Sequence, residues 1–596
     1  MRLSTRITSF KTILILMVGA GLAAFLLVPL TAIHRIRFVG AVSTCVVLFW
    51  CIGHFQDTVF RKYETWNEYT GHPLSAVKTA LILVAMMVLT IGWFGLDIFM
   101  NPFLFDYNHG NGAYCSQVMH NLCSGLGPEN TVKYNEVLFF KSNPYFYASA
   151  FSAVPHILPY LVLTPLYCLY PYPPMHVFAV VILVVICGSL GTYLAIRAVN
   201  VSRRLALIGA IGFCLLPWVE RPVFMHGHFD VISFAVYPLV FWGLFAKRWT
   251  FFYFFIVLLG IINLPYTYSV MTLGAVVFLF FRHRLHGLAT ILIGVTLMLW
   301  EKSVVRESLK GIWDVAGQPS GTLMQIFLDL DLVSFLKTLS YHGIFFFLLF
   351  LTVAFIPFYG IRKKNVWNWP VIGILLFAVA GAVMGFFRSY DLASHRNANV
   401  VVPVYLSAFM VIGDVFRNST HRVPEDVRRW SITMILCLFA GIVSMTLWFS
   451  HHYPWAGITN KGLLSVSYLR YGPVSEKYRQ VLGKMREFIP DDASVAYRID
   501  APIQAYVTNR QKAWYLGYHP EGVEYYFIQT KDIVYIDKNL PPWREYLEKV
   551  EKDKDLTLLY KDDGLVIYKN SKPKHIPRLE NVLGWGVLFR AMVPGK

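Results

Sequence analysis

Carboxylates and amides follow a long apolar segment in the stretch WFGLDIFMNPFLFDYNHGNGAYCSQVMHNL, residues 93–122. A carboxylate at the outer face of a membrane can act as general base for an acceptor hydroxyl, or hold a divalent metal that binds a phosphate leaving group. We therefore predict a catalytic role for Asp106 and, as the second candidate, for Asp97. Asn111 and Gln117 are candidates for binding substrate. The alternative for each residue is an ordinary turn in a solvated loop.

Two further polar segments are predicted to face the same compartment. His156 lies at the start of an apolar segment, where its imidazole can exchange a proton with a phosphate-bearing donor near neutral pH. The stretch FFRSYDLASHRNANV adds four candidates for binding substrate: Arg388, Asp391, His395 and Arg396. A guanidinium group matches two phosphate oxygens at once. The alternatives are a histidine hydrogen-bonded at the membrane interface and a charged loop that anchors helix ends.

A third pattern, His226, His228 and Asp230, has a spacing that can chelate a metal. The predicted order of spans places this segment on the opposite side of the membrane from the other candidates. His228 and Asp230 are therefore weak metal candidates. For a carboxylate of the first large loop, the divalent metal that its chemistry suggests is Mg or Mn.

The composition is that of a polytopic membrane protein. The 596 residues are 56% hydrophobic and 15% charged, with a mean hydropathy of +0.50, whereas soluble domains carry about 25% charged residues. We predict about thirteen spans, each long enough to cross a hydrocarbon core of about 30 Å. They are 12–33, 38–55, 77–100, 151–170, 176–198, 203–219, 229–246, 251–281, 286–301, 342–361, 368–387, 397–415 and 430–450.

The net charge of +18 is assigned to cytoplasmic loops rather than to a nucleic-acid partner, because basic loops translocate poorly. With the N-terminus inside, the loops 101–150 and 302–341 and everything after residue 450 lie outside. Two basic segments, NVSRR at 200–204 and AKRW at 246–249, would then lie outside against this rule. In the run 251–281, the motif NLPY suggests a broken helix.

Past residue 450 the pattern changes, so we divide the chain into a transmembrane domain, 1–450, and an extracytoplasmic region, 451–596. SEKYRQVLGKMREFI and PPWREYLEKVEKD read as helices, SVAYRI and DIVYID as strands, and LTLLYKDDGLVIYKN as a hairpin. These elements predict a small α/β domain.

Of the eight cysteines, Cys115 and Cys123 share the first large loop and are able to pair in an oxidising compartment. The others are interpreted as packing residues.

Several of these segments resemble the bacterial membrane-protein family named for domain of unknown function 2079, which is similar to a branch of the GT-C glycosyltransferase superfamily. The resemblance runs from about residue 93 to about residue 570. It rests on QVMHNLCSG, PHILPYLVLTPLYCLYPYPP, HFD, SHRNANVVVPVYL and the C-terminal IPDDASVAYRIDAPIQAYVTNRQKAWYL. The chain departs from the family pattern in its acidic positions, since the first-loop aspartate falls on Asn111 and NLPY holds no acid.

The resemblance implies a polytopic helical protein that transfers a sugar from a polyprenyl-phosphate donor at the external face of the bacterial cytoplasmic membrane. The acceptor would be a glycan, a lipid or a protein. Asp106 or Asp97 would deprotonate or orient it, while Arg388, Arg396 and His156 would neutralise the departing polyprenyl phosphate. Two other readings stay open: a transporter or flippase of a lipid-linked or anionic solute, and a catalytically silent membrane scaffold.

Overall fold

The structure is a computed structural model, and we describe the part of the chain whose placement it fixes. This part comprises residues 75–100, 111–124, 154–216, 218–219, 223, 229–262, 264–300, 349–354, 369–386, 397–417, 433–436, 438–439, 467–508, 512–516, 521–531, 543–562 and 564–575.

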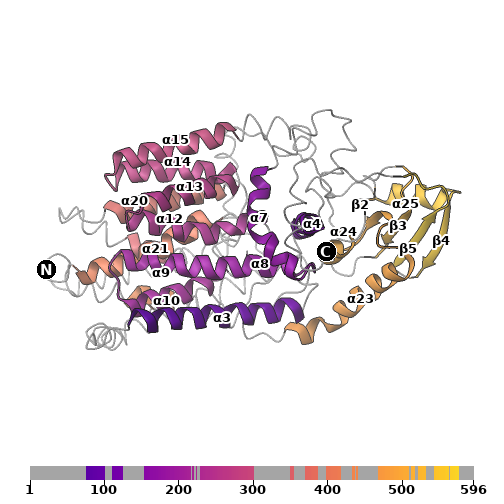
Figure 1. Cartoon of the computed structure of the whole chain (residues 1–596), viewed down its shortest axis with the longest axis horizontal. Helices are drawn as coiled ribbons and strands as arrows, with labels where there is room; N and C mark the ends of the chain where they lie inside the picture. Colours follow the sequence, from indigo (N-terminus) through magenta and orange to yellow (C-terminus); the bar gives the residue numbers. More distant parts are fainter. Residues whose placement is uncertain are drawn as a thin grey trace, which may run out of the picture.

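A bundle of apolar helices forms the larger body of the molecule, and most of its helices run along one common direction (Figure 1). Its members are α3 (Ala76–Met100), α8 (Met175–Leu183), α9 (Ser189–Ala198), α10 (Arg203–Cys214), α12 (Ser233–Phe245), α13 (Trp249–Ile262), α14 (Leu264–Leu279), α15 (Arg284–Trp300), α20 (Trp369–Phe386) and α21 (Ala398–Arg417). The π-helical segment η2 (Val184–Gly188) joins α8 to α9 without a break.

Glycines allow the helices to approach closely. A Cβ on Gly287 of α15 would lie 2.5 Å from the backbone nitrogen of Phe278 in α14, and one on Gly243 of α12 would lie 2.9 Å from the backbone of Phe252 in α13. Without a strong hydrophobic drive between helices in lipid, such close backbone packing is a main source of helix association in membranes.

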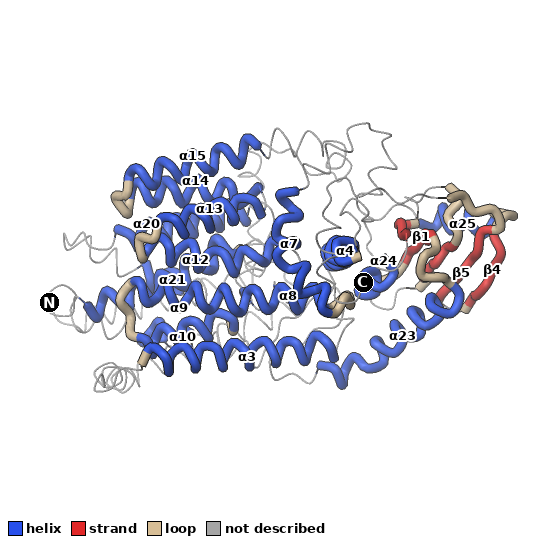
Figure 2. Tube along the Cα trace, in the orientation of Figure 1, coloured by secondary structure: helices blue, strands red, loops and turns tan. Residues whose placement is uncertain are grey.

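Three short turns connect antiparallel helices at one end of the bundle, and each contains a residue in the left-handed conformation. These residues are Asn200 (φ 64°), Lys247 (φ 54°) and Arg282 (φ 61°). In the second turn, the amide of Arg248 donates to the carbonyl of Gly243 at 2.8 Å, which closes the end of α12. Because the three turns also hold much of the nearby positive charge, we call this end of the bundle the basic end; Figure 2 shows the turns in tan.

The apolar surface of the bundle fits a lipid environment. Within the described part of the chain, two helices, Ala76–Leu96 and Met175–Ala198, are long and apolar enough by length and composition to cross a membrane, and shorter apolar helices accompany them. On α3, Val77, Leu81 and Leu96 are each at least 64% exposed. Large exposed aliphatic side chains in a row are costly in water.

Two of the predicted spans have a different form in the structure. The segment 151–170 contains α7 (Val154–Leu169), which runs across the direction of the bundle helices (Figure 1). The run 251–281 is not one broken span but two antiparallel helices, α13 and α14, separated at residue 263 and followed by Pro265 in the first turn of α14. A proline in the first turn of a helix removes no hydrogen bond, so the chain reverses there at little cost.

These two changes explain why the basic segments NVSRR and AKRW were predicted to lie on the wrong side of the membrane. The turns at 199–202, 246–248 and 280–283 all lie at the basic end, together with the start of α3 (Figures 1 and 2). NVSRR and AKRW, predicted to lie outside, are therefore at the same end as RHR (282–284), which the same order of spans puts inside, so that order was wrong. Hydropathy alone had merged α13 with α14 and had counted α7 as a span.

The C-terminal region folds into a five-stranded mixed sheet with strand order β2-β1-β3-β5-β4. The strands are β1 (Ser494–Arg498), β2 (Lys512–Tyr515), β3 (Tyr525–Gln529), β4 (Leu556–Lys561) and β5 (Leu565–Asn570). β1 pairs in parallel with β2 and with β3, while β5 is antiparallel to both β3 and β4. The predicted strand SVAYRI and the predicted hairpin are confirmed as β1 and as β4–β5, whereas DIVYID lies outside the described residues.

Helices cover both faces of this sheet. Because successive side chains of a strand point to opposite faces, the apolar side chains of one strand pack into two separate cores. One core joins α23 (Ser467–Phe488) and α24 (Ala501–Thr508) to Val495, Tyr497 and Phe527. A second core joins α25 (Trp543–Lys552) to Ala496, Tyr526 and Ile528 on the other face. Successive residues of β1 and β3 thus point into different cores.

Candidate functional site

The end of the bundle opposite the basic end carries the candidate site. Helices α3, α10, α13, α15 and α20 finish there, and α8, α12, α14 and α21 begin there, on the side of the bundle that faces the C-terminal sheet (Figure 1). We call it the sheet-side end. The short helix α4 (Asn111–Cys123) also lies there, packed against α7, α8 and α24.

Helix α4 buries polar side chains that a plain solvated loop would expose. Ser116, Gln117 and Asn121 are 0%, 3% and 5% exposed. Ser116 Oγ lies 3.4 Å from the hydroxyl of Tyr167 on α7. Gln117, predicted to bind substrate, is therefore a buried residue of a packed helix rather than part of a loose loop.

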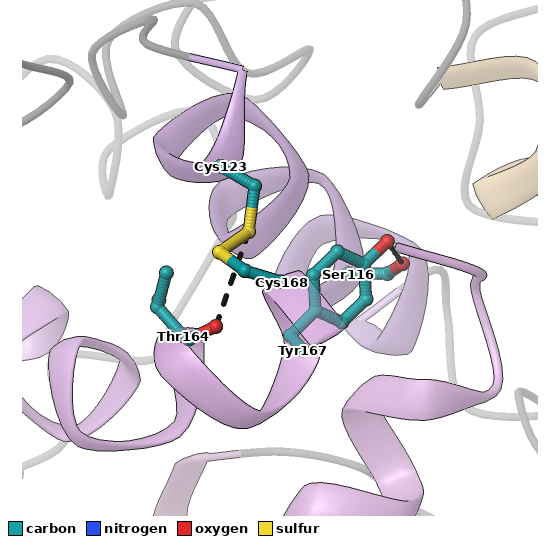
Figure 3. The surroundings of a disulfide bond; sticks show 5 residues. All are labelled: Ser116, Cys123, Thr164, Tyr167 and Cys168. Carbon is teal, nitrogen blue, oxygen red and sulfur yellow. Dashed lines mark hydrogen bonds between the residues drawn. A yellow bond between two sulfur atoms is a disulfide. The ribbon is translucent and has the colours of Figure 1, made fainter. Parts of the chain in front are cut away.

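A disulfide fixes α4 to α7. Cys123 bonds to Cys168, 45 residues later, with 5.5 Å between their Cα atoms (Figure 3). Cys123 Sγ also lies 3.9 Å from the carbonyl oxygen of Thr164 (Figure 3). Cys115 and Cys123, which the sequence left as a possible pair, are not bonded to each other, and Cys168, interpreted as a packing residue, is the partner of Cys123. The first-loop helix is thus covalently attached to the end of the bundle.

A polar cluster lies inside the bundle at the sheet-side end, where three helices begin. Asp230, in the 3-10 helix η3 (Phe229–Ile232), is 0% exposed. Its carbonyl oxygen accepts from Ser233 Oγ at 2.5 Å, and the Tyr266 hydroxyl of α14 lies 3.0 Å from Ser233 Oγ and 3.3 Å from that carbonyl. Helix α21 adds Asn399, whose Nδ2 donates to Ser269 Oγ of α14 at 3.2 Å.

This polar cluster joins segments far apart in the sequence, since Asn399 and Ser269 are 130 residues apart. An ionisable side chain inside a membrane bundle is costly, so a buried carboxylate there marks a functional site by default. The sequence offered one signal for the cluster, the aspartate itself. The partners Ser233, Tyr266, Ser269 and Asn399 were not predicted, because isolated hydroxyl and amide groups in apolar runs carry no distinctive spacing.

Nδ2 of Asn121 on α4 and Nε2 of His176 in the first turn of α8 are buried at the same end, and neither atom has a hydrogen-bond partner among the described residues. His176 Nδ1 lies 2.7 Å from the carbonyl oxygen of Pro173. Since a carbonyl only accepts, Nδ1 carries the proton and the neutral ring leaves a lone pair on Nε2. His176 was not among the site residues predicted from the sequence.

The structure brings several predicted residues to this one end. Asp97 lies in the last turn of α3, Asn111 is the first residue of α4, and His156 lies in the first turn of α7. Asp230 lies at the same end as these residues, not opposite them, so its predicted placement was wrong, because α7, counted as a span ahead of it, does not run along the bundle. Asp106, Arg388, Asp391, His395, Arg396, His226 and His228 lie outside the described residues.

The residues that the structure describes do not assemble a metal-binding group, since no three His, Cys, Asp or Glu side chains among them gather at one place. Asp230 alone supplies one carboxylate. A divalent cation needs more oxygen or nitrogen ligands than this.

A second buried polar group lies at the carboxyl ends of β1 and β3. The Arg498 guanidinium donates to the carbonyl oxygen of Gln529, and the Asp500 amide donates to Gln529 Oε1 at 3.1 Å. Asp500 Oδ2 accepts from the Tyr478 hydroxyl at 3.0 Å. These bonds fix the start of α24, the helix that packs on α4.

An apolar helical bundle with lipid-compatible faces, joined to a small α/β domain at one end, defines the class of polytopic membrane protein. The model of the family described as "Predicted membrane protein (DUF2079)" matches residues 138–560, and the chain belongs to this family. The matched region includes α7 to α25 but begins after QVMHNLCSG, so α4 is not part of it. No curated protein matches the chain.

Proposed function

We propose that this protein is a GT-C-type glycosyltransferase that moves a sugar from a polyprenyl-phosphate donor to an acceptor at the external face of the bacterial cytoplasmic membrane. The observation that carries the proposal is the buried polar cluster around Asp230 at the sheet-side end. It lies within a bundle whose described core is mostly apolar, and its 3-10 helix η3 contacts α7, the helix to which the disulfide bonds α4. A lipid-linked donor requires a polar site that is reached from both bilayer and water.

Two independent features support the proposed orientation. Basic turns favour the cytoplasmic side, and Arg203, Arg204, Lys247, Arg248, Arg282 and Arg284 lie at or next to the turns of the basic end. Structural disulfides persist in oxidising compartments, and Cys123–Cys168 lies at the sheet-side end. Both features support an orientation in which the sheet-side end and the α/β domain lie outside the cell.

In this reading, the roles of the side chains follow from their charge. Asp106 or Asp97 deprotonates or orients the acceptor hydroxyl. Arg388, Arg396 and His156 neutralise the departing polyprenyl phosphate. Asp230 joins this set, because it lies at the same end of the bundle and is held in place by the hydrogen bonds of its own backbone carbonyl.

The test uses the purified full-length protein in lipid nanodiscs with radiolabelled polyprenyl-phosphate sugars, and it measures transfer to acceptors extracted from membranes. We expect transfer by the wild type and a loss of at least about 100-fold in Asp106→Asn and Asp230→Asn, the scale of general acid–base contributions. Asp492→Asn, an exposed position of the α/β domain, is the matched control and keeps full activity.

Two outcomes would overturn the proposal. Absence of transfer from every lipid-linked sugar by the wild type leaves a transporter or a scaffold. ATP-independent movement of the lipid-linked sugar across proteoliposomes, without transfer, identifies the flippase. The orientation is tested separately: a membrane-impermeant thiol reagent added to intact cells labels Lys572→Cys and leaves Arg248→Cys unmodified.

A further inference from the structure

Six basic residues gather on two neighbouring turns at the basic end. Lys247 and Arg248 belong to the turn between α12 and α13, and Arg282, His283, Arg284 and His286 lie at the turn between α14 and α15. We call these six residues the basic-turn cluster. The four lysine and arginine side chains are exposed. None of the proposed roles in sugar transfer uses them.

Aromatic contacts hold the two turns together as one surface. The Trp249 indole stacks on the His286 imidazole, with ring centroids 3.6 Å apart and planes at 7°. The His283 imidazole and the same indole are arranged edge to face, with ring centroids 5.0 Å apart. The Tyr253 hydroxyl lies 2.8 Å from His286 Nδ1. These contacts fix the spacing between the charges of the two turns.

The positive charge of the cluster has no local compensation. The sequence holds no aspartate or glutamate between Asp230 and Glu301. Across the described part of the chain, no carboxylate pairs with Lys247, Arg248, Arg282 or Arg284. Burial, and then the positive charges of Lys247 and His286, hold the pKa of His283 below its ordinary value.

The backbone adds to this potential. Helix α13 begins at Trp249 and α15 begins at Arg284, so two helix N-termini lie beside each other at the cluster. The first amides of a helix carry unsatisfied partial positive charge. An anion at this place is therefore favoured by side chains and by backbone together.

The surface next to the cluster is strongly apolar. Leu285 is 82% exposed and Phe254 is 62% exposed, and Phe251 and Leu288 are exposed beside them. A ligand that satisfies both surfaces has an anionic head and apolar chains. That combination describes a phospholipid at a membrane interface.

We propose that the basic-turn cluster is a binding site for the phosphate headgroup of an anionic phospholipid, with the acyl chains lying along the exposed faces of α13 and α15. The site is independent of sugar transfer at the opposite end of the bundle. It selects anionic over zwitterionic lipid, because the headgroup supplies the negative charge that the protein lacks here.

The experiment measures lipid retention by native mass spectrometry of the full-length protein, exchanged into detergent with either phosphatidylglycerol or phosphatidylcholine. We expect the wild type to retain phosphatidylglycerol in preference to phosphatidylcholine. The double variant Arg248→Gln/Arg284→Gln lowers that affinity about 30-fold, since each basic residue near an anionic surface contributes about fivefold. The double variant Arg248→Lys/Arg284→Lys keeps most of the affinity because it keeps both charges.

The matched control is Lys561→Gln/Lys569→Gln, which removes two exposed charges from the sheet and leaves lipid retention unchanged. Thermal unfolding verifies that each variant is folded, and Arg248→Gln alone replaces the double variant if that one unfolds. Equal retention of the two lipids overturns the proposal, as does a loss in the sheet control equal to that of Arg248→Gln/Arg284→Gln. Displacement of the lipid by inorganic phosphate at equal concentration also overturns it, since the site would then bind the free anion.

Discussion

The hydroxyl of Tyr506 donates to the hydroxyl of Tyr172 at 3.3 Å, and the two rings meet edge to face with centroids 5.5 Å apart. Tyr506 belongs to α24 of the sheet domain, and Tyr172 lies in the turn that precedes α8. Tyr172 in turn contacts Tyr170, and Tyr170 contacts Phe99 at the end of α3. A continuous row of aromatic rings thus connects the sheet domain to the bundle.

This contact predicts how firmly the sheet domain is held. Tyr506→Ala removes a nearly buried ring and is expected to cost about 3–5 kcal/mol of local stability, whereas Tyr506→Phe removes one long hydrogen bond and costs about 1 kcal/mol or less. Hydrogen exchange of the α4 and α24 amides in the full-length protein measures both effects. Tyr560→Phe, on the distant strand β4, is the control and leaves the exchange of those amides unchanged. Equal exchange in Tyr506→Ala and in the wild type would show that the row of aromatic rings does not hold the sheet domain on the bundle.

The disulfide predicts a redox-sensitive attachment of α4. The Cys123–Cys168 bond closes a loop of 45 residues. It lowers the entropy of the unfolded chain and thereby raises the free energy of unfolding by about 4 kcal/mol. Cys123→Ser or reduction is therefore expected to lower thermal stability and to increase hydrogen exchange in α4. Cys168→Ser should reproduce the effect of Cys123→Ser, and the double variant should add little to either. Mass-tagging with maleimide before and after reduction counts the bonded thiols. Cys187 and Cys214 are free in the structure, so they react without reductant once the protein is unfolded.

Close helix packing predicts opposite results at two glycines. Gly287→Ala places a Cβ 2.5 Å from the Phe278 backbone, which cannot move aside as a flexible side chain can. We expect a loss of about 1–3 kcal/mol and separation of α14 from α15. Gly92→Ala on α3 meets nothing within 4 Å and is expected to be neutral or to stabilise by up to about 1 kcal/mol. Thermal unfolding in matched detergent compares the two; equal melting temperatures would contradict the packing of α14 on α15.

The β4–β5 hairpin predicts a pH dependence at its turn. Burial acts to raise the pKa of Asp562, but the amides of Gly564 and Leu565 and the Tyr560 hydroxyl outweigh it and hold that pKa below its ordinary value. Because the folded pKa is depressed, the stabilisation is present above the unfolded pKa and disappears as pH falls through the folded pKa. The protection of the β5 amides against hydrogen exchange, relative to the intrinsic rate at each pH, should fall below about pH 4. Asp562→Asn should remove most of this pH dependence, whereas Asp555→Asn, which breaks only the exposed pair with Lys572, should not.

The local elements of the fold were accessible from the sequence. Long apolar runs around α3, α8–α9 and α15 predict helices, because a chain in lipid must satisfy its backbone hydrogen bonds internally. Alternation in SVAYRI and the turn within LTLLYKDDGLVIYKN predict β1 and the β4–β5 hairpin, since both signals arise from neighbouring residues. β2, β3 and α24 were not predicted, and their positions depend on pairing between segments that are distant in the sequence.

The site was accessible only in part. Asp230 carried a recognisable signal, but hydropathy alone placed it at the wrong end of the bundle. Hydropathy measures how apolar a segment is and not the direction in which it runs, so α7 was counted as a span and α13–α14 as one. The partner of Cys123 was equally hidden, because a disulfide joins the cysteines that the fold brings together. Composition and periodicity thus determined a membrane bundle with an α/β domain, while tertiary packing decided which end of the bundle holds Asp230, Cys168 and α4.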